Sequence, residues 1–544
     1  MAGEYGEREE RESSTLTVGA LLDDERVWLA VSLLAGSVVV ASYYLTHPYP
    51  AYATALFPHM AELLIENGYR RPETIPLYTA DGVPFAYPPL MFYVMAVLID
   101  LGVDPFRLVR LLPGVAIVLA LIPYFYLARE FLPVRQAGFA TVMLAVVPQI
   151  VRWNISGGGT VRGPAVLFLL AGLYVGVRLF KTGDRRWILP GALLYGLTML
   201  THPVQMAYFG LSYLVLFAVF DPSIRGLVNG AAVAVGGAIV GAPWWLYVSL
   251  TYGYETILNA SATHGGLFSS ELQDVLADVL LFHSSSFPSE LLTGSLVLAG
   301  AVYALSKRRY ALPAWFVVTA VVITQPRFAY IPGAMLMGMA VAGAVVPWLA
   351  EVATGRGDRG ESSPGADADG GRETVAAVAL VALVVTTTWF GALYVAGDPP
   401  GEDRNAMSSY VDGDDIEAME WVRSETPADA QFVVLGDAAE WFPYVAERTG
   451  LTVWWGVEWT TPEQYEHQRA LHGDLTACDD EACITATLEE YDLDPDYVYV
   501  PNGEYTAGSG VQTQDEAMRE SMIESDRYEL VYENDGAMVY RVTD

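Results

Sequence analysis

Residues 110–159 read RLLPGVAIVLALIPYFYLAREFLPVRQAGFATVMLAVVPQIVRWNISGGG, and they contain two apolar runs in close succession. A short charged loop, Arg129–Arg135, separates the two runs, and three glycines follow the second one. A helix needs roughly 20 mostly apolar residues to cross a lipid bilayer. The stretch therefore predicts two membrane helices that are joined by a short basic loop.

Similar apolar stretches lie on both sides of this pair. With 53% hydrophobic and 17% charged residues over 544 positions, and a mean hydropathy of +0.31, the chain is too apolar for a disordered protein. We predict a polytopic α-helical membrane domain over residues 27–396 that follows a tail of residues 1–26. About eleven candidate spans lie near residues 27–45, 108–128, 136–151, 163–180, 187–200, 204–220, 226–250, 291–305, 311–324, 328–350 and 374–396.

The basic loops indicate how these spans are oriented, because short loops rich in arginine and lysine stay in the cytoplasm. All five basic loops fall on the same side of the membrane as the N-terminus if the apolar segment 85–101 is an external interfacial helix. We therefore predict a cell-membrane protein with a cytoplasmic N-terminus and an extracellular C-terminal domain. The Gly- and Asp-rich residues 354–372 are predicted to form a flexible cytoplasmic linker. The five basic loops are Arg129–Arg135, Lys181–Arg186, Asp221–Arg225, Lys307–Arg309 and Arg356–Arg372.

Acidic residues dominate the charge of the chain. The net charge is −33, and residues 398–544 alone hold 35 acidic and 7 basic residues. Such a surface repels phosphate, which argues against a nucleic-acid partner. Only two positions are lysine, so nearly all positive charge is arginine. High salt screens self-repulsion of this kind, and we expect a halophilic archaeal source.

The C-terminal segment alternates predicted strands with predicted helices. FVVLG, LTVWW and YVYVP have the composition of short buried strands, and residues 414–424 and 514–525 have helical patterns. This alternation predicts an extracellular α/β domain over 398–544. In CDDEAC, Cys478 and Cys483 either close a small disulfide loop or, less in keeping with their spacing, form part of a metal site.

Four predicted external loops are of interest: 46–107, 152–163, the short loop with His202, and 251–290; the candidate catalytic groups lie in the first. A sugar donor on the outer face must be carried there by a lipid, and transfer then needs a carboxylate or imidazole that accepts a proton from the acceptor hydroxyl. His59 and Glu62 would share one face of a helix in FPHMAELLIENGY, and Asp81 follows in the same loop. Alternatively, His59 and Glu62 lie on a solvated amphipathic helix and Asp81 is an ordinary turn residue.

The leaving phosphate of such a donor needs positively charged or imidazole partners. Arg152 and Arg162 flank three consecutive glycines, whose backbone can closely approach a phosphate. His202 and Arg327 lie at the external ends of spans. The alternatives are snorkelling arginines, a lipid-headgroup anchor at Arg327 and a packing histidine at His202.

The run 105–187 resembles the membrane core of oligosaccharyltransferase catalytic subunits and, more broadly, the GT-C superfamily of lipid-donor glycosyltransferases, dolichyl-phosphate-mannose transferases among them. The shared pattern is a span, a short basic loop, a second span and an external loop with proline, arginine and glycine. FPHMAELLIENG with YPPL behind it is similar to the family's first loop. AMEWVRSETPADAQFVVLGDAAEWFPYVAERTG resembles the start of its soluble domain.

The chain also departs from that family. The family's first-loop aspartate would fall near Ala55, and its second-loop acidic pair near Gly159–Val161, where this chain has no acidic residue. Those carboxylates hold a divalent metal in the relatives that use pyrophosphate donors. The resemblance thus disfavours a Mg²⁺ or Mn²⁺ cofactor, predicts none, and favours a lipid monophosphate donor with Arg162 supplying the positive charge.

The acceptor-reading WWDYG signature of oligosaccharyltransferases would fall at LGDAA, residues 435–439, where only Asp437 matches. We place Asp437 and the nearby Glu440 on the acceptor side, and we expect that the chain does not read Asn-x-Ser/Thr peptides. The similar WWGVEW at 454–459 is out of register, and its pair Trp454–Trp455 is predicted to be strand core.

The resemblance and the external groups together predict an inverting glycosyltransferase. It would move a sugar from a polyprenyl (dolichyl) phosphate to a glycan, glycolipid or glycoprotein acceptor on the outer face, in contact with membrane lipid. One alternative is a non-catalytic relative that binds lipid-linked sugars or assembles with a partner. A transporter or flippase is disfavoured because the sequence shows no convincing inverted repeat and almost no charge within the spans.

Overall fold

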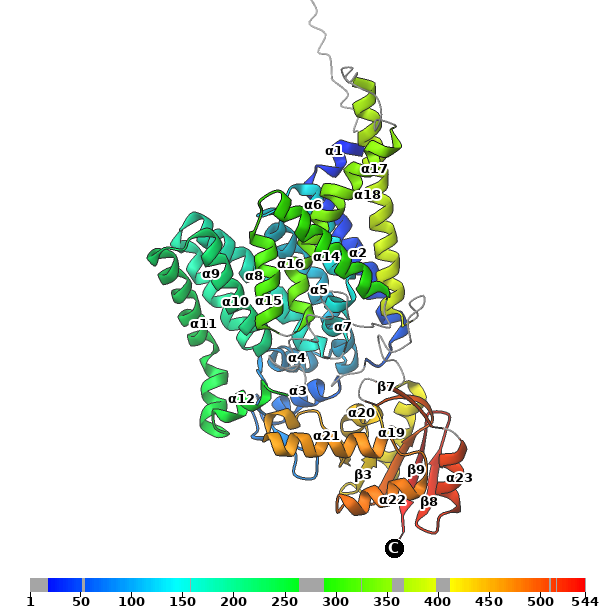
Figure 1. The fold of residues 1–544 in the computed structure, drawn as a ribbon. Coiled ribbons are helices and arrows are strands. Elements are labelled where there is room, and N and C mark those ends of the chain that lie inside the picture. The colour runs from blue at the N-terminus through cyan, green and yellow to red at the C-terminus, as the bar shows by residue number, and fades with distance from the viewer. Residues whose placement is uncertain are drawn as a thin grey trace, which may run out of the picture.

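The chain forms a helical bundle with a smaller strand-containing domain at one end (Figure 1). The computed structural model describes residues 18–50, 54–156, 158–263, 288–323, 325–354, 366–397, 411–507, 510–514 and 516–543. The predicted tail up to residue 17, most of the loop 251–290 and residues 355–365 of the predicted linker lie outside these ranges.

The bundle consists of apolar helices that follow the predicted spans. Before the domain come α1 (Val18–Leu22), α2 (Glu25–Thr46), α3 (Leu56–Glu66), α4 (Leu90–Asp100), α5 (Pro105–Arg129), α6 (Val134–Val146), α7 (Pro148–Ile155), α8 (Gly159–Thr182), the 3-10 helix η1 (Arg185–Trp187), α9 (Ile188–Met199), α10 (Pro203–Phe220), α11 (Ile224–Thr251), α12 (Glu255–Ala260), α14 (Pro288–Ser306), α15 (Ala311–Val322), α16 (Pro326–Ala340), the π-helical turn η2 (Val341–Val345), α17 (Val346–Ala353) and α18 (Ala366–Val395).

Seven helical stretches within the described ranges are long and apolar enough to cross a membrane. They are Glu25–Thr46, Pro105–Arg129, Gly159–Thr182, Pro203–Phe220, Ile224–Thr251, Pro326–Ala353 and Gly370–Val395. The other predicted spans fall on α6 with α7, on α9, on α15 and on residues 291–306 of α14, each of which has fewer than 18 residues. The predicted polytopic helical membrane fold is confirmed.

Ion pairs show that α2 begins at the end of the bundle where α5 stops. Arg129 at the end of α5 pairs with Glu25 at the start of α2 at 2.8 Å, and Arg135 pairs with Asp23 at 2.8 Å. The loop between α2 and α5 therefore lies at the opposite end. The helix α4 within that loop has 11 residues, about 16 Å of rise, which is too short to cross a bilayer. The prediction that segment 85–101 does not span is in line with this geometry.

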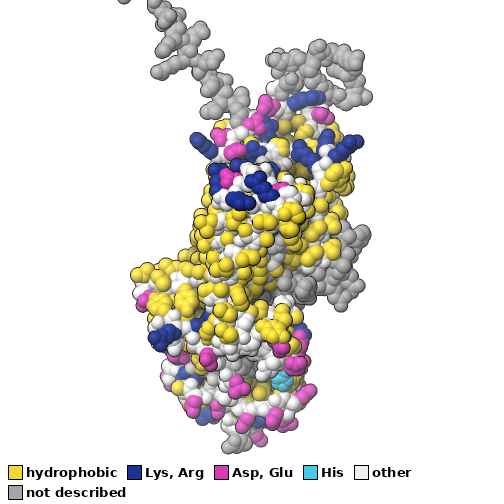
Figure 2. Space-filling model, turned by 90° about the vertical axis from the view of Figure 1, so that its left-hand side faces the viewer, with side chains coloured by type: hydrophobic (Ala, Val, Ile, Leu, Met, Phe, Trp, Pro, Cys, Tyr) yellow, Lys and Arg dark blue, Asp and Glu magenta, His cyan; other side chains and the backbone are white. Residues whose placement is uncertain are grey.

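Basic side chains gather at the end of the bundle farthest from the C-terminal domain. Figure 2 shows them above a belt of hydrophobic side chains, with acidic residues scattered over the domain at the other end. Glu130 pairs there with Arg178 and Lys181 at 3.1 and 3.0 Å. The loops Arg129–Arg135 and Lys181–Arg186, predicted to share one side of the membrane, thus meet at one end of the molecule.

The C-terminal domain has a five-stranded mixed sheet with the order β4-β3-β5-β9-β8. β3 pairs in parallel with β4 and β5, whereas β9 is antiparallel to both β5 and β8. The predicted α/β domain is confirmed. Its elements are α19 (Gly413–Glu425), β3 (Gln431–Val434), α20 (Ala438–Val445), β4 (Thr449–Gly450), the 3-10 helix η4 (Val457–Trp459), α21 (Pro462–Thr476), α22 (Glu481–Glu490), β5 (Tyr497–Pro501), the hairpin β6 (Gly503–Ala507) and β7 (Gly510–Gln514), α23 (Glu516–Glu524), β8 (Tyr528–Glu533) and β9 (Ala537–Val542).

The two faces of this sheet bury different residues of the same strand, as the two-residue period of a strand requires. On β3, Val433 points to the face covered by α21, α22 and α23, in a core with Leu471 and Ile484. Phe432 and Val434 point to the other face, which is covered by α19 and α20. That second core does not end at the domain boundary.

The first loop of the membrane domain shares this second core. It contributes α3, α4 and a hairpin of β1 (Thr74–Ile75) with β2 (Val83–Pro84). Trp441 of α20 is 1% exposed and stacks on Phe106 at the start of α5, with ring centroids 5.6 Å apart. Tyr78 forms a parallel bridge with Gly450 of β4, so the loop also extends the edge of the sheet. Bundle and domain are therefore joined through one buried apolar core.

Three local predictions require comment. LTVWW is not a strand: residues 451–456 consist of two turns joined by irregular backbone, and η4 follows them. The predicted loop 152–163 is helical apart from a short break between α7 and α8. Cys478 and Cys483 form a disulfide with Cα atoms 5.5 Å apart, which resolves the two alternatives for this pair.

The shared core makes a testable prediction about Trp441. Its replacement by alanine removes the ring that stacks on Phe106, and we expect a loss of about 3–5 kcal/mol of stability, as for other buried aromatic residues. Thermal unfolding of the full chain in detergent would measure it. The control is Trp348→Ala, at a residue that is 59% exposed; equal effects of the two substitutions would contradict the shared core.

Candidate active site

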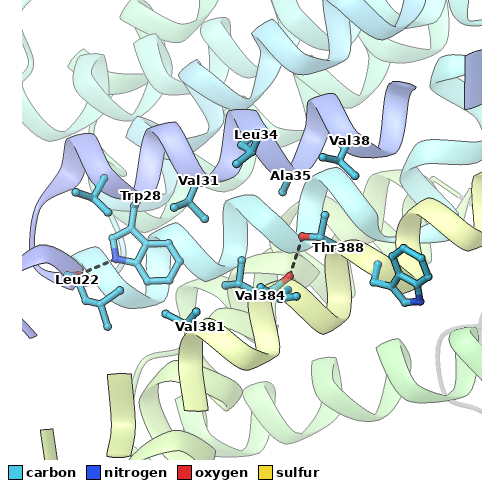
Figure 3. A pocket seen from close by; sticks show the side chains of 12 residues that line it. Leu22, Trp28, Val31, Leu34, Ala35, Val38, Val381, Val384 and Thr388 are labelled. Carbon is cyan, nitrogen blue, oxygen red and sulfur yellow. Dashed lines mark hydrogen bonds between the residues drawn. The ribbon is translucent and has the colours of Figure 1, made fainter. Parts of the chain in front are cut away.

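Two pockets of the molecule differ in the polar groups that line them. The larger, of about 390 Å³, is a groove between α2 and α18 (Figure 3). Its wall is apolar, and the polar groups of Trp28 and Thr388 are already bonded to the backbone carbonyls of Leu22 and Val384, both at 2.7 Å. With no polar group left to act on a ligand, this groove lacks the chemistry of a reaction site.

The second pocket lies where the bundle meets the C-terminal domain, and we term it the interface cavity. It has a volume of about 240 Å³ and both apolar and charged walls. The helices α3, α8, α10 and α12 and the turn before η4 all contribute to it. Its lining residues are Leu56, Phe57, Tyr87, Gly158, Arg162, His202, Pro203, Val204, Met206, Ala207, Ile257, Leu258, Ala260, Ser261, Thr263, Trp455, Glu458 and Trp459.

Arg162 enters the cavity from the first turn of α8. Its guanidinium lies 5.9 Å from the centre of the Trp153 ring and donates a hydrogen bond to the Trp153 carbonyl at 3.4 Å. Gly158 leaves room for it, because a Cβ at that position would stand 2.4 Å from Nη1 of Arg162. The Nε atom of Arg162 is buried and has no partner among the described residues.

His202 enters from the N-terminal end of α10, where it is the residue before Pro203. It is 5% exposed, and its ring lies 6.1 Å from that of Tyr87. Burial holds the pKa of His202 well below its usual value, and the positive charges of Arg162 and Arg327 lower it further. The imidazole is therefore neutral at physiological pH and can either donate or accept a hydrogen bond.

Arg327 lies behind the cavity wall at the start of α16. It is 7% exposed, and its Nε and Nη2 atoms have no partner within the described ranges. Its charge acts on Arg162, His202 and Tyr87. Burying two unpaired guanidinium groups close together is costly, so this region is favourable for an anion.

Glu458 is the acidic residue of the cavity wall, and sequence reasoning did not single it out. It lies on η4 in the WWGVEW segment, together with Trp455 and Trp459, which also line the cavity. The segment is thus not the strand core that the sequence suggested. The two tryptophans beside a carboxylate could have indicated a binding site in this segment. The segment was set aside because it is out of register with the family's acceptor-reading motif.

The predicted bases His59 and Glu62 lie on α3, where it faces the C-terminal domain. Glu62 accepts a hydrogen bond from the Tyr444 hydroxyl at 3.1 Å, and His59 packs between Tyr78 and Tyr444. Burial lowers the pKa of His59 to about 4. The structure brings neither of the two side chains to the interface cavity.

The remaining predicted residues are also elsewhere. Asp81 is exposed in the turn between β1 and β2, and Arg152 lies on α7 with its guanidinium 4.9 Å from the centre of the Trp153 ring. Asp437 and Glu440 are buried at the start of α20. The structure therefore gathers Arg162, His202 and Arg327 of the nine predicted site residues, and it separates the other six from the cavity.

A divalent metal does not fit the residues that are gathered here. The cavity wall offers one carboxylate, Glu458, and one imidazole, His202, beside two guanidinium charges that repel a cation. Within the described ranges, no three His, Cys, Asp or Glu side chains group as metal ligands would. Positive charge at this site comes from arginine.

One family profile and several solved structures are similar to this chain. Residues 86–247 match the family profile described as dolichyl-phosphate-mannose-protein mannosyltransferase, and this range includes Arg162 and His202. Among solved structures, the fold resembles that of the oligosaccharyltransferase AglB from Archaeoglobus fulgidus, in complex with an inhibitory peptide and a dolichol-phosphate. The TM-score is 0.52 at 14% identity, over 87% of this chain and 69% of that chain.

The chain shares the fold of this membrane enzyme. Two further structures agree with this: ArnT from Cupriavidus metallidurans bound to undecaprenyl phosphate, with a TM-score of 0.54 at 13% identity over 95% and 97% of the two chains, and the arabinofuranosyltransferase AftD from Mycobacteria, with 0.53 at 15% identity over 95% and 40%. No curated protein sequence matches the chain significantly. The resemblance inferred from the sequence is confirmed.

The glycines beside Arg162 make a second prediction. An alanine at Gly159 would put its Cβ 2.3 Å from the Asn154 carbonyl oxygen, which is fixed backbone, whereas at Gly158 it would meet the movable end of Arg162. We expect Gly159→Ala to lose on the order of 1–3 kcal/mol of stability and Gly158→Ala less than about 0.5 kcal/mol. Denaturation in detergent would compare them; equal losses would show that the break between α7 and α8 is not packed in this way.

His59 makes a third prediction, about pH. Its pKa is about 6.5 when unfolded and about 4 in the folded chain, so folding favours the neutral ring. The stabilising effect is complete above pH 6.5 and is lost as the pH falls from 6.5 through about 4. Over this pH range, the free energy of unfolding of the wild type should fall by on the order of 3 kcal/mol more than that of His59→Gln. Parallel stability curves for the two proteins would rule out a buried neutral His59.

Proposed function

We propose that the protein transfers a sugar from a polyprenyl-phosphate carrier, dolichyl phosphate in an archaeal membrane, to a hydroxyl acceptor at the interface cavity. The proposal rests on the GT-C fold, the match of residues 86–247 to a mannosyltransferase family and, above all, one observation about charge. That observation is a pair of arginines with buried, unpartnered N–H groups: Arg162 lines the cavity, and the charge of Arg327 acts on both Arg162 and His202.

A lipid monophosphate has the chemistry that this pair requires. Its oxygens accept hydrogen bonds from guanidinium N–H groups, and its charge offsets theirs in a region of low dielectric constant. The neutral His202 can donate a further hydrogen bond to the same group. The apolar wall from α10 and α12, with Met206 and Ile257, would accommodate the first isoprene units of the carrier.

The same residues would assist the departure of the phosphate. As the bond between the anomeric carbon and the phosphate oxygen breaks, negative charge grows on that oxygen. Arg162 and Arg327 already lie at the site before the reaction, so they stabilise this charge with little reorganisation. Attack by the acceptor hydroxyl from the opposite side of the sugar would invert the anomeric configuration. No divalent metal enters this scheme.

The acceptor would approach from the side of the C-terminal domain. Trp455 and Trp459 line the cavity there, and aromatic rings are suited to contact with the apolar face of a sugar. We place this side outside the cell membrane and the N-terminus in the cytoplasm, since the basic loops lie at the opposite end of the bundle. A glycan, glycolipid or glycoprotein could supply the hydroxyl.

The arginine pair makes a fourth prediction. We expect Arg162→Gln and Arg327→Gln each to weaken binding of dolichyl phosphate by about 10- to 100-fold, the range for loss of a hydrogen bond to a charged group. Binding of radiolabelled dolichyl phosphate to the purified full chain in detergent would measure it. Arg107→Gln, at an exposed arginine on the first turn of α5, is the matched control.

Arg152→Gln tests the choice of cavity in the same assay. Arg152 is outside the cavity wall, so we expect its substitution to leave dolichyl-phosphate binding within about twofold of wild type. A large effect at Arg152 with none at Arg162 or Arg327 would move the phosphate site to α7. Wild-type protein that binds the lipid and never releases sugar from dolichyl-phosphate mannose, glucose or N-acetylglucosamine would instead favour a binding protein.

A further inference from the structure

Glu458 has a fixed position at the border between the C-terminal domain and the membrane domain. One of its carboxylate oxygens accepts a hydrogen bond from the backbone N–H of Gly456 at 2.7 Å. Gly456 has a φ of +92°, a conformation that favours glycine, and a Cβ there would stand 2.7 Å from Val83 of the first loop. The tight approach of β2 therefore holds the turn that orients this carboxylate.

The carboxylate also faces the groups that would hold the donor. It lines the same cavity as Arg162, His202 and Tyr87, and the charge of Arg162 acts on it directly. Its neighbour Trp459 lies 5.4 Å from Tyr87 between ring centroids. Glu458 is thus on the side of the cavity that belongs to the C-terminal domain, opposite the arginine that enters from α8.

We propose that Glu458, a residue of the C-terminal domain, is the catalytic base of the transfer. This inference rests on the proposed function, since it concerns the same cavity and the same donor. In the step, the carboxylate of Glu458 removes the proton of the acceptor hydroxyl while the hydroxyl oxygen forms a bond to the anomeric carbon. The bond from that carbon to the phosphate oxygen breaks, and its electron pair leaves with the polyprenyl phosphate. Glu458 then returns the proton to water.

The acid–base properties of Glu458 suit this role. Burial raises its pKa to about 7, although the Gly456 N–H and the charge of Arg162 act in the opposite direction. A base works best when its pKa is close to the working pH, because it is then both ionised and basic enough to take a proton. Among the residues of the cavity wall, the neutral His202 is the other potential proton acceptor, and two guanidinium charges disfavour its protonation.

The other candidate bases are poorly placed for the same step. The Glu62 carboxylate is engaged by Tyr444, His59 packs among tyrosines, and Asp81 is exposed at a hairpin turn. None of the three lines the interface cavity. Glu458 is the carboxylate that shares the cavity with Arg162.

The test uses the full chain and dolichyl-phosphate mannose, glucose or N-acetylglucosamine with a labelled sugar, and it measures both lipid binding and sugar release. We expect Glu458→Gln and Glu458→Ala to bind dolichyl phosphate within about twofold of wild type and to release sugar about 10²- to 10⁴-fold more slowly, the usual effect of losing a general base. Azide, a nucleophile with no proton to lose, should restore turnover to Glu458→Ala as a glycosyl azide. A residue with a merely structural role would not be rescued in this way.

Matched variants decide between this inference and its alternatives. Glu463→Gln, at an exposed glutamate on α21, should behave as wild type. Wild-type rates in Glu458→Gln, or azide rescue of Asp81→Ala or His59→Ala in place of Glu458→Ala, would overturn the role of Glu458 and leave the transferase function intact. Failure of the wild type to release sugar from any of the three donors would overturn the transferase function itself.

Discussion

The arrangement of the whole protein depends on the apolar core that the first loop shares with the C-terminal domain. Without it, the domain would depend on smaller contacts with the bundle, such as Trp459 against Trp244 of α11, and the interface cavity would lose one of its walls. Trp441 stacked on Phe106 and Val83 packed against Gly456 fix the domain against the helical bundle. An apolar core of this size is rigid, since packed side chains tolerate little displacement. The position of each cavity residue is therefore determined by residues far from any chemistry.

That rigidity explains how two arginines can remain buried without a salt bridge to a described acidic residue. Arg327 and Arg162 come from the ends of α16 and α8, which are held in the bundle by helix packing; Gly163 of α8, for example, lies directly against Pro113 of α5. A protein can bury an unpaired charge when the rest of its fold is stable enough to offset the desolvation penalty. A bound anion then recovers part of that penalty. The same desolvation makes the guanidinium groups more effective toward a phosphate than surface arginines would be. The stability of the bundle therefore makes possible the buried charges that would give the site its affinity for an anionic headgroup.

The sequence predicted the parts of this protein that local patterns determine. Apolar runs located the helices, charge placement indicated that α4 does not cross the membrane, and the ends of the spans drew attention to Arg162, His202 and Arg327. Glu458 was missed because its neighbours, LTVWW before it and Trp459 after it, match a buried strand in composition. Only the tertiary packing of Gly456 against Val83 turns that segment into a cavity wall. Conversely, His59 and Glu62 carry reactive groups, and packing against Tyr444 directs them into the domain interface.

The same packing accounts for the chain's departure from the carboxylate pattern that the GT-C resemblance implies. The first-loop position expected to be acidic falls near Ala55, which is fully buried in the shared core. A carboxylate there would lose its hydration to apolar neighbours such as Phe57 and Met60, at a cost of several kcal/mol. An acidic group on η4 avoids that cost, because Gly456 donates a hydrogen bond to it and Arg162 lies across the cavity. Moving the carboxylate from the first loop to the domain that closes over it thus keeps negative charge beside the donor site and leaves the core that positions the site apolar.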